Sequence, residues 1–211
     1  MMGWFDFVRS PQVPVVETLE IPLFPLQAVL FPGSLLPLRI FEQRYLDMAA
    51  ACLKENRPFG ICLIASGQET GAAAEPHAVG TLATIGNWEM EQLGILQIIA
   101  HGGRRFRILE SRTGAGQLLQ ARVEVIPDNG PLALPAERQR LLPLLRRVVG
   151  DLGGERIPEP HHYDDAEWVG YRISEILPIQ NLARQKLLEL EDPLARLQIL
   201  EKYLDQRKLL D

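Results

Sequence analysis

The chain has 211 residues, a formal net charge of −5 and a hydrophobic content of 46%, which is ordinary for a globular protein. A chain of this length buries enough surface to fold without disulfide bonds or a structural metal. The negative charge balance argues against a dedicated nucleic-acid binder, because the affinity of such proteins depends on neutralising phosphates.

Prolines divide the segment 21–45 into short pieces. Because proline removes a backbone donor and fixes φ, it disrupts helices and central strands, so we expect extended pieces at residues 23–30 and 35–40. The sequence FPGS at 31–34 predicts a type II turn, whose third residue needs the positive φ that glycine allows. From Phe41 onward apolar residues recur at helical spacing, which predicts a helix with Phe41 on its apolar face.

The middle of the chain is typical of strands separated by turns. In the segment 118–126, apolar and polar residues alternate as in a strand with one dry face and one wet face. A loop rich in Gly, Ala and Glu is expected at 66–78. About six or seven short strands favour a closed or nearly closed antiparallel β-barrel, because closure removes exposed edges. The other strands expected in this part are 59–64, 79–85, 93–100 and 106–110.

The pattern becomes helical after the turn-forming residues 127–131. Apolar stripes predict helices near 141–148 and 169–177, and two more begin at Asn181, an expected N-cap, and at Asp192-Pro193. The predicted fold class is therefore α+β. We expect an antiparallel β-barrel domain with one inserted helix at residues 1–126, followed by a helical bundle domain at 127–211.

Cysteines and apolar segments indicate the compartment. Cys52 and Cys62 lie in apolar segments and form no CxxC pair, so we expect two reduced core thiols. The N-terminus lacks the basic start and long apolar run of a secretory signal. The sequence holds no span-length apolar stretch free of prolines and charges. We therefore expect a cytoplasmic protein that does not bind membranes.

Motifs for catalysis and for cofactor binding are absent from the sequence. It holds no Walker loop, no GxGxxG and no GxSxG, so we predict a protein that is not an enzyme and binds no cofactor. His161 and His162 precede Tyr163, Asp164 and Asp165. Neighbouring residues point in different directions and no third ligand follows at helical spacing, so we predict no metal site. A catalytic pair assembled from residues distant in sequence stays open as an alternative.

Arginines are concentrated between residues 101 and 122, where five of them stand against the single acid Glu110. Glycines at 102 and 103 let the backbone approach an anion, and arginines supply paired donors. Arg104, Arg105 and Arg107 are therefore candidate anion-binding residues. The alternative is a hairpin turn at 102–105 in which Arg105 and Arg107 point to solvent. The complete set is Arg104, Arg105, Arg107, Arg112 and Arg122.

An ordered series of motifs runs through residues 18–205. It reads IPLFPL, VLFPG, LPLRIFE and RY, then FGICLI, VGTLATI and GILQIIAHGGRRFRI, and finally LPIQNLARQKLLELEDPLARLQILEKYL. This series resembles the Lon N-terminal domain family, also called the Lon substrate-binding domain. The resemblance implies a PUA-like barrel. Some barrels of this type bind RNA.

The same resemblance implies a partner. In Lon proteases this domain is thought to engage protein substrates, while separate ATPase and protease domains do the work. No Walker motif or protease domain stands in these 211 residues, so we expect a stand-alone copy of the recognition part. The expected partner is unfolded or extended polypeptide, with Lon or another protease as a further partner.

Large apolar residues at expected turns are candidate contacts for such a polypeptide. Trp88 and Met90 fall at an expected hairpin tip, residues 86–90, and Leu35 and Leu36 stand beside the 31–34 turn. Ordinary packing in or around the core is the alternative for all four. The leading prediction is a non-enzymatic protein- or peptide-binding module. The alternative function is RNA or anion binding by the arginine-rich segment.

Overall fold

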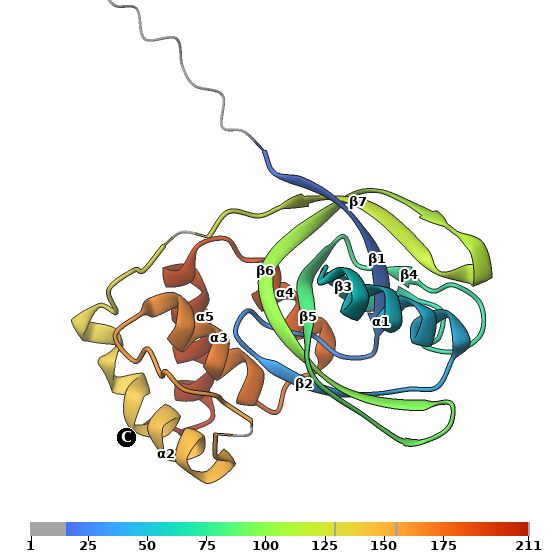
Figure 1. Cartoon of the computed structure of the whole chain (residues 1–211). Helices are drawn as coiled ribbons and strands as arrows, with labels where there is room; N and C mark the ends of the chain where they lie inside the picture. Colours follow the sequence, from blue (N-terminus) through green and yellow to red (C-terminus); the bar gives the residue numbers. More distant parts are fainter. Residues whose placement is uncertain (1–15, 129, 155, 211) are drawn as a thin grey trace, which may run out of the picture.

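The computed structural model describes residues 16–128, 130–154 and 156–210, which form a mixed α/β structure (Figure 1). Its strands are β1 (Thr18–Leu26), β2 (Leu35–Ile40), β3 (Phe59–Ser66), β4 (Glu75–Pro76), β5 (Val79–Gln92), β6 (Ile95–Thr113) and β7 (Leu119–Val125). Its helices are α1 (Gln43–Glu55), α2 (Leu142–Leu152), α3 (Ala166–Ile176), α4 (Asn181–Glu189) and α5 (Pro193–Gln206). Short 3₁₀ turns lie at Ala115–Gln117 and Ala136–Leu141.

The strands form one sheet in the order β1-β7-β6-β5-β3-β4, and β3 pairs a second time with β1. Strand β2 pairs with β6, beside this path. Every pair is antiparallel except β1 with β3, where Leu23 stands opposite Gly60 in a parallel register. The expectation of a purely antiparallel arrangement is therefore wrong for this pair. β1 and β3 are joined through β2 and α1, and only such a crossover lets two strands run parallel.

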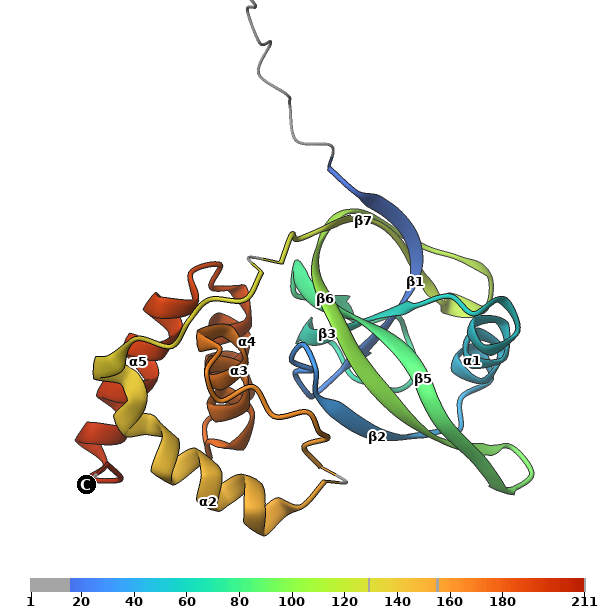
Figure 2. The ribbon, with the colours of Figure 1, turned by 60° about the vertical axis from the view of Figure 1, so that its left-hand side comes forward.

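Helix α1 lies on one side of the sheet and helices α2–α5 lie together on the other, as the two views show (Figures 1 and 2). The apolar face of α1 packs onto the strands, with Phe24 stacked on Tyr45 at 4.0 Å between ring centroids. Cys52 on this face and Cys62 in β3 are both buried and free, which confirms the expected core thiols. Phe41 precedes α1 and is 58% exposed, so its expected place on the buried face is wrong.

The proline–glycine turn at 31–34 forms as expected. Gly33 has a φ of +72°, and the Ser34 N–H donates to the Phe31 carbonyl at 3.1 Å. The turn also lies on β6, because Gly33 N donates to Gly102 O at 2.8 Å and Gly102 N donates to Ser34 O at 2.9 Å. A local turn signal therefore also fixes a long-range contact.

The two other expected turns are placed differently. The β5–β6 hairpin turns at Leu93-Gly94, where Gly94 has a φ of +85°, and not at residues 86–90. The segment 102–105 lies within β6 and forms no hairpin turn. A Cβ on Gly102 would stand 2.3 Å from the Phe31 carbonyl oxygen, so this glycine permits close backbone approach instead of a turn.

Of the two expected helix caps, one forms and the other does not. Asp192 caps α5 by accepting from Leu194 N at 2.8 Å, with Pro193 in the first turn, as expected. Asn181 is not the cap of α4, which begins after Gln180, and its side-chain amide donates instead to the Gln27 carbonyl. A long-range contact with the segment that follows β1 therefore takes the place of the local cap. Among the helices of the described residues, none combines the length and the apolar character that crossing a bilayer requires.

Arg172 of α3 joins the helices to the 31–34 turn. Its guanidinium is fully buried and donates to the Pro32 carbonyl at 2.6 Å, the Gly33 carbonyl at 3.1 Å and the Ser34 hydroxyl at 2.8 Å. Glu175 pairs with it at 3.1 Å. Burial lowers the pKa of Arg172, and the Glu175 carboxylate opposes this shift. The arginine therefore satisfies acceptors on both sides of the junction at once.

Arg105 of β6 makes the reciprocal contact, from the sheet to the helices. Its guanidinium donates to the Leu188 and Leu190 carbonyls at 2.8 Å each, at the C-terminal end of α4, and the residue is 4% exposed. The apolar core of the helices also takes in Phe31 and Val79 from the sheet side. Polar and apolar contacts therefore fix the position of the helices on the sheet.

We expect Arg172→Met to lower the free energy of unfolding by about 3–5 kcal/mol, because it leaves Glu175 and the two turn carbonyls without their buried donor. Urea denaturation measures the change. Arg147→Met, at an exposed position of α2, is the matched control and is expected to change it by less than about 0.5 kcal/mol. Equal effects of the two substitutions would show that the junction does not depend on Arg172.

We expect Gly102→Ala to cost about 1–3 kcal/mol, because the new methyl group meets a backbone carbonyl that cannot move independently of the turn. Gly103→Ala is the control, since its Cβ would lie 3.3 Å from the Leu82 carbonyl oxygen, a far milder approach. Thermal or urea unfolding of both variants distinguishes them. A larger loss for Gly103→Ala would contradict the close approach at Gly102.

Candidate functional site

Strand β2 runs from the helices towards the β5–β6 hairpin (Figure 2). Three hollows lie along this strand. The first, the junction cavity, has a volume of about 420 Å³ and lies between the 28–36 segment and helices α2, α3 and α4. The second has a volume of about 280 Å³ and lies between β2, the end of β1 and α1. The third has a volume of about 590 Å³ and lies across the face of β2, β6 and β5, where β6 separates the other two strands.

Neighbouring hollows share lining residues along β2, and we call the three together the β2 groove. The junction cavity and the second hollow share Ala28 and Leu36. The second and third share Pro37, Leu38 and Arg39. In the described part of the chain, β2 pairs with β6 alone, so its other edge is open; the second hollow is lined by β2 without β6, whereas the third also takes in β6. An unpaired strand edge offers backbone donors and acceptors to a further strand.

The structure brings three of the four apolar candidates to this groove. Leu35 and Leu36 are half-buried and line the junction cavity, and Trp88 is 57% exposed and lines the third hollow. Met90 is 50% exposed on the same strand as Trp88, but it lines none of the three hollows. Trp88 lies within β5, opposite Ile98 of β6, and not at a hairpin tip.

Several groove residues were missed by sequence reasoning. Phe41, which is exposed and precedes α1, lines the second hollow. Its position just outside the helix was the one signal in the sequence that could have indicated this. Arg156 and Arg184 line the junction cavity from the loop after α2 and from α4. Nothing local marks these two arginines, because the cavity exists only once distant segments have packed together.

The charged side chains that line the junction cavity differ in how fully they are bonded within the protein. Glu175 accepts from the Ser34 hydroxyl at 2.9 Å and is paired with Arg172. Arg184 donates to the Asn181 side-chain oxygen at 3.1 Å and to the Leu177 carbonyl at 2.9 Å. Glu175, the carboxylate in the described lining of the cavity, is therefore already neutralised by an arginine outside that lining.

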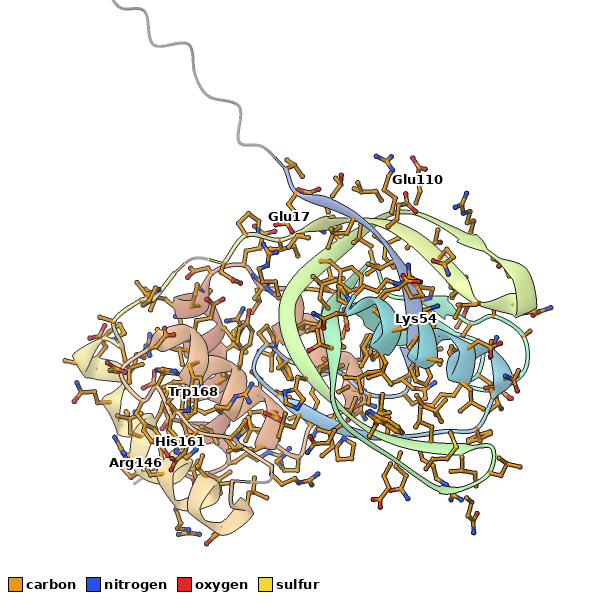
Figure 3. All side chains as sticks on the ribbon, in the orientation of Figure 1. Glu17, Lys54, Glu110, Arg146, His161 and Trp168 are labelled. Carbon is orange, nitrogen blue, oxygen red and sulfur yellow. The ribbon has the colours of Figure 1, made fainter. Side chains whose placement is uncertain are left out.

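The arginine-rich segment is largely committed to contacts within the protein. Arg104 forms a two-bonded pair with Glu17 at 2.7 and 2.8 Å, which lowers the pKa of that carboxyl. Arg107 pairs with Glu191 at 3.2 Å, and Arg122 pairs with Glu110 at 2.6 Å. Glu17 and Glu110 lie on the outer surface beside β1 and β7 (Figure 3). With Arg105 buried against α4, four of the five arginines have protein partners.

The histidines at 161 and 162 belong to an aromatic cluster beside α2 and α3, near the labelled Arg146 and Trp168 (Figure 3). Ring centroids of His161 and Tyr163 lie 5.8 and 5.1 Å from that of Trp168, and the Arg146 guanidinium lies 3.8 Å from the Tyr163 ring. Among the described residues, no group of three His, Cys, Asp or Glu side chains is placed to hold a metal. These rings pack against one another.

Comparison with known proteins places this chain in a family. Residues 20–206 match the ATP-dependent protease La (LON) substrate-binding domain. The crystal structure of a Lon N-terminal domain protein from Xanthomonas campestris superposes with a TM-score of 0.74 at 34% identity, covering 88% of this chain and 98% of that one.

Curated relatives are longer than this chain. Lon protease 1 of Bdellovibrio bacteriovorus is 29% identical over 137 residues, which is 63% of this chain and 17% of that protein. Protein cereblon of Xenopus tropicalis is 32% identical over 166 residues, which is 74% of this chain and 36% of that protein. The chain thus spans a minor part of each. On the match over residues 20–206, it belongs to the Lon substrate-binding domain family.

Proposed function

We propose that this chain is a non-enzymatic polypeptide-binding module, and that an extended segment of an unfolded protein lies in the β2 groove. The observation that carries the proposal is a row of adjoining hollows along β2, a strand whose second edge no other described strand occupies. The family, named for substrate binding, supports the same class of ligand.

The groove offers both kinds of contact that recognition of an extended chain needs. The open edge of β2 supplies main-chain hydrogen bonds, which bind any sequence, and the hollows receive alternate side chains, which gives preference. Leu36 and Leu38 supply apolar area on β2, and Trp88 supplies it on β5, across β6. Each square ångström of apolar surface removed from water contributes about 25 cal/mol, so an apolar client binds better than a polar one.

The finer description of the fold belongs to the same proposal. The pairing path from β1 through β7, β6, β5 and β3 back to β1 supports a PUA-like barrel domain at residues 1–126. The common apolar core of α2–α5 supports a helical bundle at 127–211. We place the protein in the cytoplasm, where unfolded clients and a Lon-type protease are its expected partners.

The alternative, RNA or anion binding through the arginine-rich segment, is less well supported by the geometry. Glu17, Glu191 and Glu110 neutralise three of its arginines, and Arg105 is buried. A phosphate backbone would have to displace these carboxylates before it gained any contact. A hydrolase has similarly little support, because Ser34 in the junction cavity is tied to the Arg172–Glu175 pair.

We expect Trp88→Ala to weaken binding of an unfolded model protein by about tenfold or more, the size typical of an aromatic hot-spot residue. Fluorescence anisotropy of the labelled client measures the affinity. The melting temperature should change little, because Trp88 is more than half exposed. Met90→Ala is the matched control, on the same strand and outside the groove, and is expected to change affinity by less than about twofold.

The same assay distinguishes the alternative. Binding of mixed RNA at low salt that falls steeply with added salt, and that is lost in Arg104→Gln, would favour the arginine-rich segment. Equal client affinity in Trp88→Ala, Met90→Ala and the parent protein would contradict binding in the β2 groove.

A further inference from the structure

We propose that the junction cavity receives the C-terminal carboxylate of the bound polypeptide, and that Arg156 and Arg184 recognise it. This inference rests on the proposed function, because it assigns one end of the client to one end of the β2 groove. It adds a chemical preference that apolar contacts alone do not give: a free chain end next to an apolar residue.

The charge of the cavity carries the first part of the argument. Among the described residues, its lining holds Arg156, Arg184 and the carboxylate of Glu175, which is already paired with Arg172. Arg156 is exposed and forms no ion pair with any of the described residues. The Nε atom of Arg184 is buried without a hydrogen-bond partner in the same part of the chain. The cavity therefore has more guanidinium donors than the carboxylate in its described lining can satisfy.

The chemistry of the walls selects the kind of anion. Apart from these charged groups the lining is mostly apolar, with Phe31, Leu35, Val148 and Ile176 among its residues. A phosphate or sulfate would leave that apolar surface uncovered. A carboxylate attached to an apolar residue satisfies both, because its oxygens accept from the guanidinium groups while its side chain covers the wall.

The position of the cavity favours a chain end over an acidic side chain inside the client. The cavity is the terminal hollow of the β2 groove, since it shares lining residues with the second hollow only. Beyond it stand helices α2, α3 and α4. The first turn of α4 begins at Asn181 in its wall without a side-chain cap, and helix N-termini favour negative charge. An extended client therefore ends there.

The test compares short labelled peptides with leucine at alternate positions, one ending in a free carboxylate and one in an amide. Fluorescence anisotropy at low salt is expected to show about tenfold tighter binding of the free acid, as for a charge-assisted hydrogen bond. Arg156→Gln should remove most of that difference. Arg147→Gln, an exposed arginine of α2 outside the cavity, should leave it unchanged.

The outcomes separate this inference from the proposed function. Equal binding of acid and amide, with both weakened by Trp88→Ala, would overturn the carboxylate site and leave the groove standing. Equal binding of the free acid and of an amidated peptide with an internal glutamate would overturn recognition of a chain end. If neither Trp88→Ala nor Arg156→Gln weakened binding of the free acid, both the carboxylate site and the β2 groove would be overturned.

Discussion

A fully buried guanidinium, that of Arg172, holds the turn at 31–34 against helix α3. A charge removed from water in this way is tolerated only when hydrogen bonds and an opposite charge replace its hydration, and the two turn carbonyls, Ser34 and Glu175 do so. The contact depends on Gly33, whose positive φ shapes the turn, and on Gly102, which lets the turn approach β6. Sheet, turn and helices thus meet at one point.

The β2 groove is a consequence of this junction. The turn leads directly into β2, so fixing the turn fixes where the strand leaves the helices and pairs with β6. Helices α3 and α4 then close one end of the groove as the junction cavity, and the β5–β6 hairpin carries Trp88 to its other end. The same contacts that stabilise the fold therefore create a row of hollows along a strand with an open edge.

Local signals predicted the parts of the fold that depend on neighbouring residues. Pro32-Gly33 predicted a turn and Asp192-Pro193 a helix start, because both rest on the backbone preferences of the residues themselves. Gly102 was misassigned because a glycine that makes a turn and one that permits close approach look alike in sequence. Trp88 was found as an exposed aromatic residue, whereas Arg156 and Arg184 were not, since segments distant in sequence build their cavity.

Amide hydrogen exchange with and without an extended apolar peptide tests the central claim, that the strand edge beside the Arg172 junction is the binding surface. The account predicts slowed exchange on addition of peptide at the amides of Leu35–Ile40 that face the groove and in the first turn of α4. It predicts no change along residues 104–122. Slowing confined to that arginine-rich segment, or no slowing in β2 at a peptide concentration that saturates binding, would contradict it.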